Sequence, residues 1–152
     1  MAATTKAIEV SSAQARRIWL RAQRLDEPVP FGAGPEAVRA AVAHLGYVQI
    51  DTINVIERCH HHILWTRMPE YRRADLAQAQ SVDKSVFEYW THALAYVPAA
   101  ELRYFLPDMR RRQLAPGAWF ASVKAEDLEK VMALVSEGGP LSIRDIDDDV
   151  LV

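Results

Sequence analysis

The chain has 152 residues, half of them apolar, and a formal charge of −2. This length supports one core of ordinary size and does not require two. No run approaches the roughly 18 consecutive apolar residues of a membrane span, and residues 1–10 lack the apolar stretch of a secretory signal, so we expect a cytoplasmic protein. The single cysteine, Cys59, excludes an internal disulfide and a thiolate cluster for zinc or iron–sulfur binding, and we expect a small buried side chain there.

The end of the chain is acidic and the rest is basic. From Lys124 onward eight acidic residues accompany three basic ones, so residues 1–123 carry a net charge of +3. The basic side chains that could contact DNA phosphates are Arg72, Arg73, Arg110, Arg111 and Arg112. Cations near the C-terminus of a solvated helix give the same pattern and are the commoner case.

The first part of the chain predicts two helices and a strand. Ser11 and Ser12 precede a helix over 13–24, and a loop with three prolines and two glycines follows. A second helix is expected over 35–45, with Gly46 as its stop. Residues 47–51 then alternate as a strand, with Val48 and Ile50 toward the core and Tyr47, Gln49 and Asp51 on the other face.

The remaining segments are mainly helical. Asn54 and Glu57 have the spacing of a capping box, which predicts a third helix from about Val55 to Trp65 or Arg67. A shorter helix is expected over 71–80, with Leu76 and Ala79 inward. Further expectations are an extended aromatic segment over 86–96, helices over 99–113 and 125–137, and a short helix that Ser142 caps within 141–152.

The segment 45–67 carries a family resemblance. It combines a Gln-apolar-Asp strand with a helix that ends in His-His-x-x-Leu-Trp, and it closely resembles the AlkZ/YcaQ family of winged-helix DNA glycosylases. The segments 86–93 and 139–145 also resemble that family. The resemblance implies a mainly α fold with short β elements: a winged-helix (helix-turn-helix) type domain and the start of a second winged helix.

The resemblance also implies an organisation and an activity. Members of the family have more than twice this length, so we expect 1–123 to be a winged-helix-like N-terminal domain with the Gln-Ile-Asp motif and 124–152 to be an incomplete second one. This chain is then a fragment or a truncated product. The implied reaction is hydrolysis of the N-glycosidic bond of alkylated bases, such as N7-alkylpurines, with unhooking of interstrand crosslinks. It needs no metal or organic cofactor. The implied partner is double-stranded DNA with alkylated bases or crosslinks, in the bacterial cytoplasm at the nucleoid, without a membrane or an obligatory protein partner.

The family motif assigns the catalytic role to Gln49 and Asp51. Residues i and i+2 of a strand project from one face, so the two side chains can address one small volume. A carboxylate there could stabilise an oxocarbenium-like sugar and accept a proton from water, while Gln49 orients that water. Without the resemblance, Asp51 would be interpreted as an N-cap or turn residue and Gln49 as an ordinary strand residue.

Other side chains are candidates for DNA binding or support of the site. Those that could stack on bases are Tyr47, Trp65, Tyr89 and Trp90, although ordinary core packing is the favoured interpretation for the tryptophans. His61 and Trp65 share a helix face at i, i+4, and His92 could donate to a phosphate or a carboxylate or be purely structural. His60, His61 and His62 point about 100° apart on a helix, which argues against a metal site.

Two other functions remain open at this point. A non-catalytic winged-helix module for DNA binding or regulation would bind undamaged duplex in a salt-sensitive way and release no base. A truncated product without independent activity would expose apolar surface near 141–152.

Overall fold

The computed structural model describes residues 7–115, 117, 122–139, 141 and 146. These form two units, Met1–Arg103 and Tyr104–Val152, which we describe separately. The domain boundary expected from the sequence, near residue 123, stays a prediction.

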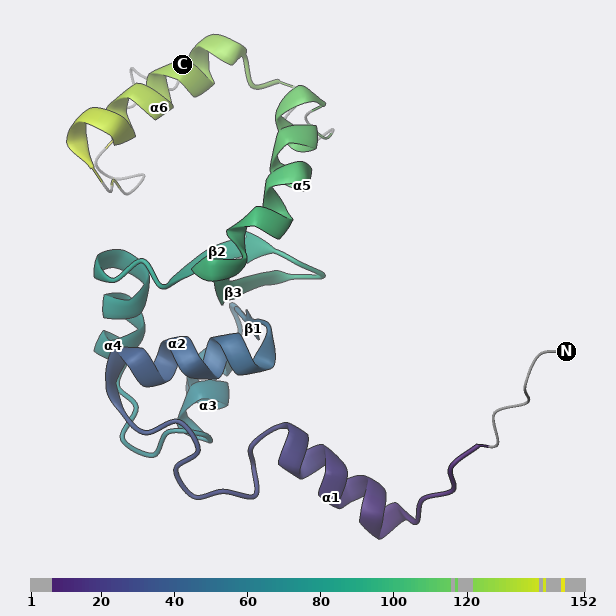
Figure 1. Ribbon diagram of the computed structural model, residues 1–152. Coiled ribbons are helices and arrows are strands. Elements are labelled where there is room, and N and C mark those ends of the chain that lie inside the picture. The colour runs from purple at the N-terminus through teal and green to yellow at the C-terminus, as the bar shows by residue number, and fades with distance from the viewer. Residues whose placement is uncertain (1–6, 116, 118–121, 140, 142–145, 147–152) are drawn as a thin grey trace, which may run out of the picture. The chain divides into compact units, whose positions relative to one another are not determined.

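The first helix, α1 (Ser12–Ala22), begins where the sequence predicts (Figure 1). The Ser11 hydroxyl accepts a hydrogen bond from Gln14 N, and Gln14 Oε1 accepts one from Ser11 N at 2.8 Å, which closes a capping box. No residue of α1 is buried. The chain after it is held by Arg67, whose guanidinium donates to the Gln23 carbonyl at 3.0 Å. Local hydrogen bonds therefore define α1, and tertiary hydrogen bonds hold the chain at its C-terminal end.

Helix α2 (Gly34–Leu45) supplies one wall of the core. Its buried residues, Ala37, Val38, Ala41 and Val42, recur at helical spacing and lie on one face. Pro35 occupies the first turn, and Gly46 ends the helix with φ of 79°, a conformation that other residues adopt only with strain. The predicted helix and its stop are confirmed.

Three short strands form an antiparallel sheet in the order β1-β3-β2. They are β1 (Val48–Gln49), β2 (Val86–Trp90) and β3 (Leu94–Pro98). The predicted extended segment over 86–96 is thus a hairpin, while β1 is shorter than predicted. Its alternation is confirmed, because Val48 is buried and Ile50 packs against the core. Ile50 N also donates to Leu94 O at 2.8 Å, so pairing with β3 continues beyond Gln49.

The third helix, α3 (Cys59–Trp65), begins four residues later than predicted. Asn54 caps no helix; it forms an antiparallel bridge with Arg58, and residues 51–58 are a loop. Glu57 does not take part in a helix cap, since its carboxylate pairs with Arg73 and accepts a hydrogen bond from Arg58 N. The predicted capping box over 54–57 was therefore wrong, because the Glu57 carboxylate pairs with Arg73 and the backbone of Asn54 lies in a β-bridge instead of at the start of a helix.

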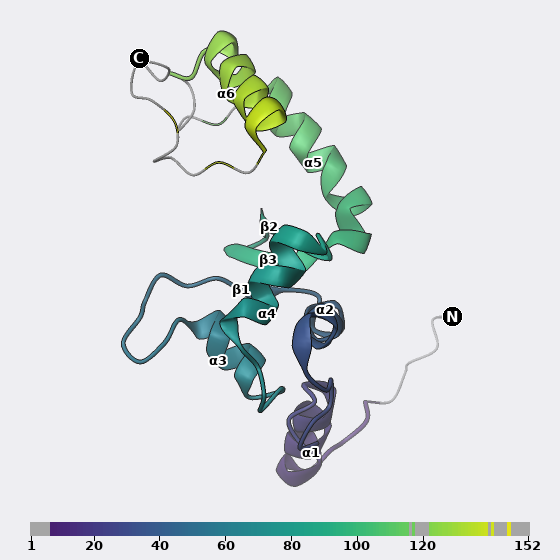
Figure 2. The same cartoon turned by 90° about the vertical axis from the view of Figure 1, so that its left-hand side faces the viewer.

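The fourth helical segment is α4 (Arg73–Ala77), which continues into the π-helix η1 (Gln78–Val82). The predicted inward residues, Leu76 and Ala79, are both buried. Helix α2 contacts β3, α4 and η1, and α3 contacts β1 (Figures 1 and 2). This unit ends in a β-hairpin and contains a three-stranded sheet, and its elements follow one another as α2-β1-α3-α4-β2-β3. This arrangement is compatible with the expected winged-helix type of domain.

The chain continues through the 3₁₀ turn η2 (Ala99–Glu101) into α5 (Leu102–Leu114), and a later segment forms α6 (Ala125–Gly138). The helices expected over 99–113 and 125–137 are confirmed. The expected cap at Ser142 lies outside the described residues. Among the helices of the described ranges, none is long and apolar enough to cross a membrane.

Candidate active site

Gln49 lies on β1 and its side chain meets the turn of the β2–β3 hairpin. His92 Nε2 is 3.2 Å from Gln49 Oε1 and, since an amide oxygen only accepts, donates to it. The His92 ring also meets Tyr47 edge-on, with centroids 5.1 Å apart. Three residues singled out from the sequence, Tyr47, Gln49 and His92, are therefore neighbours. The contact between His92 and Gln49 fixes the direction of the Gln49 amide.

Asp51 follows the strand and is half-buried. Its Oδ1 accepts a hydrogen bond from Ile53 N at 2.9 Å, as in an Asx turn, so the turn-residue interpretation describes part of its role. Within the described part of the chain, no hydrogen bond is made to Oδ2. Asp51 lines a pocket of about 260 Å³. Its other lining residues are Ile53, Val55, Ile56, Glu57, Cys59 and His62.

Cys59 lines the same pocket as Asp51 and contacts β1. Its Sγ donates to the Gln49 carbonyl at 3.3 Å, and the side chain is partly rather than fully buried. Burial, with the nearby charge of Asp51, raises the pKa of the Cys59 thiol. The thiol form is therefore favoured, and Cys59 positions the start of α3 against β1 rather than acting as a nucleophile.

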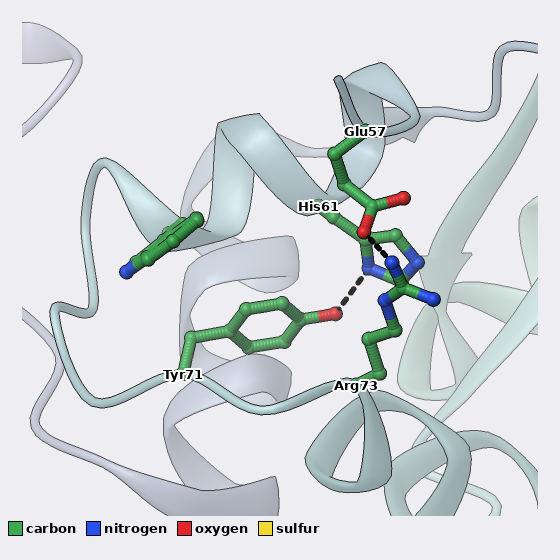
Figure 3. A pocket seen from close by; sticks show the side chains of 5 residues that line it. Glu57, His61, Tyr71 and Arg73 are labelled. Carbon is green, nitrogen blue, oxygen red and sulfur yellow. Dashed lines mark hydrogen bonds and ion pairs between the residues drawn. The ribbon is translucent and has the colours of Figure 1, made fainter. Parts of the chain in front are cut away.

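A second pocket, of about 170 Å³, shares Glu57 with the first. Figure 3 shows Glu57 and His61 facing Tyr71 and Arg73 across it. His61 Nδ1 is 2.6 Å from the Tyr71 hydroxyl, and Arg73 forms an ion pair with Glu57. Burial raises the pKa of Tyr71, so this phenol stays protonated near neutral pH. Trp65 completes the lining, which confirms that His61 and Trp65 share one face.

His60 is buried beneath the site, only 3% exposed. Burial, followed by the charges of His61 and Arg58, lowers its pKa to about 4, so the ring is neutral at pH 7. The centroid of its ring lies 5.6 Å from that of Tyr96, and its buried Nδ1 has no hydrogen-bond partner among the residues that the structure describes. His62, by contrast, is exposed. Over the described ranges, no three potential metal ligands gather at one point.

The tryptophans differ from the favoured interpretation. Trp65 is 57% exposed and Trp90 is 58% exposed, so the assignment of both as core aromatics was wrong. The Trp65 indole is nevertheless held, because its Nε1 donates to the Pro69 carbonyl at 3.2 Å. A fixed, exposed ring is a suitable platform for a stacking partner.

The arginine run lies on α5, in the second unit. Arg111 and Arg112 both pair with Asp108, at i,i+3 and i,i+4, while Arg110 is exposed. Part of the positive charge of this run is therefore balanced within the helix. Contact between this run and DNA stays a prediction.

The model of the AlkZ-like DNA glycosylase family matches residues 42–152. The chain belongs to this family. The match covers most of the chain, begins near the end of α2 and includes Gln49, Asp51 and His92, whereas α1 precedes it. No solved structure is significantly similar to the chain. Membership of the AlkZ-like family indicates a DNA glycosylase function in DNA repair, with DNA as the substrate.

Sequence reasoning missed part of the polar lining of the two pockets. Glu57 was assigned to a helix cap, Tyr71 received no site role, and Arg73 was considered only as a contact to DNA phosphates. The i, i+4 pair of His61 and Trp65 was the only local signal of the second pocket. Contacts such as that between Glu57 and Arg73 join segments separated by a whole helix, and no pattern within either segment predicts them.

Proposed function

We propose that this chain carries the hydrolytic centre of a DNA glycosylase that removes N7-alkylated purines, including those that form interstrand crosslinks. Gln49 and Asp51 are the catalytic residues in this proposal. The observation that carries it is the family match across the Gln-Ile-Asp motif, together with the position of Asp51 in a pocket bordered by exposed apolar side chains.

The chemistry requires a carboxylate and a positioned water. Alkylation at N7 puts positive charge on the purine, so the base departs as a neutral molecule with the electrons of the glycosidic bond and needs no general acid. The sugar is left with oxocarbenium character at C1′, which a nearby carboxylate stabilises. Water then forms the C1′–O bond and gives a proton to that carboxylate.

Asp51 has one oxygen for each of two tasks. Oδ1 is committed to Ile53 N, which fixes the orientation of the carboxylate, and Oδ2 is the oxygen that we assign to water and the developing charge. The half-buried setting strengthens this electrostatic contribution because less water screens it.

Gln49 acts on the water through an amide whose direction His92 sets. The Gln49 oxygen has two lone pairs, one for the His92 proton and one for the water, and its NH₂ group can donate to the sugar or a phosphate. Loss of Gln49 should therefore slow base release more than it weakens DNA binding.

The experiment is base release from duplex DNA that carries N7-methylguanine, with quantification of the free base. Asp51→Asn should reduce the rate at least tenfold, since a general base contributes about 10²–10⁴-fold. Asp83→Asn is the matched control, because Asp83 is an exposed aspartate whose side chain accepts from Gln78, as an asparagine also can. Equal rates for the wild-type chain and Asp51→Asn would refute the assignment.

A non-catalytic DNA-binding module is the alternative. It predicts salt-sensitive binding to undamaged duplex with no base release from the folded wild-type chain. A crosslinked duplex, assayed in parallel for strand separation, tests the wider substrate range independently of the methylated one.

A further inference from the structure

The loop between β1 and α3 exposes three branched apolar side chains. Ile53 is 68% exposed, Val55 89% and Ile56 87%. Figure 2 shows this segment extending away from the sheet and helices of its unit. A single exposed apolar residue is ordinary, but three within four positions, next to a candidate catalytic carboxylate, mark a binding surface. We call Ile53, Val55 and Ile56 the apolar tip.

The base of the loop is braced. Asp51 Oδ1 accepts from Ile53 N at one end, and Asn54 forms an antiparallel bridge with Arg58 at the other. Glu57 Oε1 accepts from Arg58 N at 2.9 Å, and the same carboxylate pairs with Arg73. These contacts hold the apolar tip in one shape before any partner binds, which lowers the entropic cost of binding.

The surroundings of the apolar tip favour a polyanion with an apolar interior. Arg58 at the end of the loop is exposed, and so are Arg72 and Arg73. Arg73 lines the adjoining pocket, where it pairs with Glu57. Proteins that kink DNA insert apolar side chains between base steps while cations contact the flanking phosphates. The combination of an apolar tip and neighbouring arginines matches that chemistry better than it matches a purely apolar partner.

The apolar tip also adjoins the candidate catalytic group. Ile53, Val55 and Ile56 line the same pocket of about 260 Å³ as Asp51. A nucleotide beside the inserted tip would therefore have its sugar close to the carboxylate, in a region from which the apolar side chains exclude water.

We propose that the apolar tip is a wedge that inserts into the base stack of duplex DNA, next to the nucleotide attacked at Asp51. The location of the attacked nucleotide rests on the proposed function, whereas insertion itself does not. Insertion separates the stacked bases at the lesion and gives the sugar access to the pocket.

The test uses a duplex with 2-aminopurine beside an N7-methylguanine whose sugar carries fluorine at C2′. The fluorine prevents base release, so the rise in 2-aminopurine fluorescence reports unstacking alone. The wild-type chain should raise this fluorescence severalfold at saturation. The variant Ile53→Ser/Val55→Ser/Ile56→Ser should lose the increase and retain the salt dependence of binding, since its arginines are intact. The control is Ile18→Ser/Val82→Ser, which changes two exposed residues of α1 and η1 and should behave as the wild-type chain.

Three results would overturn the wedge. One is an equal fluorescence increase from the triple variant, and another is saturable binding by the wild-type chain with no increase. The third is sedimentation of the wild-type chain as an oligomer and of the triple variant as a monomer. In that case a second copy of the chain would cover the apolar tip. Unstacking without base release from the unfluorinated duplex would reject the proposed function alone, and base release from that duplex without unstacking would reject the wedge alone.

Discussion

Replacement of the buried His60 by leucine should make the stability of the protein less sensitive to acid. The folded environment lowers the pKa of His60 to about 4 from the usual 6.5, mainly because burial disfavours the charged ring. When folding lowers the pKa of a group, the group makes its full contribution to stability at pH values above the pKa that it has in the unfolded chain. That contribution is lost as the pH falls from about 6.5 toward 4, because His60 then binds a proton in the unfolded chain and remains neutral in the folded chain.

The magnitude follows from the two pKa values. At pH 5 the His60 ring is almost fully protonated in the unfolded chain and largely neutral in the folded one. The resulting loss in the free energy of unfolding, relative to pH 7.5, is about 2 kcal/mol. His60→Leu removes this titration. It also removes a buried Nδ1 that has no hydrogen-bond partner among the described residues, which offsets part of the free-energy cost of the substitution.

The assay is urea denaturation of the wild-type chain and the variant at pH 7.5 and pH 5. The wild-type chain should lose about 2 kcal/mol more than His60→Leu between the two pH values. His62→Leu is the control, because His62 is exposed and its replacement should leave the difference unchanged. If the wild-type chain and His60→Leu lose the same free energy, the ring is not held neutral by burial and the reasoning fails.

Three further predictions concern the site and the core. His92→Ala should slow base release about fivefold, which corresponds to the loss of a hydrogen bond of about 1 kcal/mol. The same substitution should have no additional effect in a Gln49→Ala chain. Additive losses in this double-mutant cycle would show that His92 does not act through Gln49. Leu64→Ala should lower the free energy of unfolding by about 2–5 kcal/mol in urea denaturation, since Leu64 is fully buried, and a loss below about 1 kcal/mol would contradict its place in the core. Gly46→Ala should cost about 1–2 kcal/mol by the same measurement, because φ is 79° there and open space around the residue leaves backbone strain as the cause; an unchanged midpoint would argue against the left-handed cap.

Local patterns predicted the elements whose hydrogen bonds close locally. Ser11 and Gln14 cap α1 across three residues, and Gly46 ends α2 through its own positive φ. The alternation at Val48 and Ile50 indicates which face of the strand is buried. In each case the determining interaction, or the conformational preference, lies within the segment itself.

The errors arose where a distant residue decides the outcome. Asn54 and Glu57 have capping-box spacing, yet Glu57 pairs with Arg73 from the next helical segment and the chain remains a loop. Trp65 is an aromatic residue of a kind that is often buried, yet the tertiary fold buries the face of α3 that carries His60 and Leu64 and leaves Trp65 57% exposed. The candidate site was predicted only through the family motif, since the partnership of Gln49 with His92 depends on strand pairing that the sequence does not display.

The pairing of β1 with β3 has a consequence for the order of events in folding. Val48 and Gln49 find their partners, Tyr96 and Ala95, only at the far side of the hairpin, so their contact closes a long stretch of chain. Such contacts are slow because the loop entropy is lost before the pairing is gained. During synthesis, helix α2 can form as soon as it emerges, but Gln49 acquires His92 only after β3 has been made. The geometry of the candidate site therefore forms only after helices α1 to α4 have been synthesised.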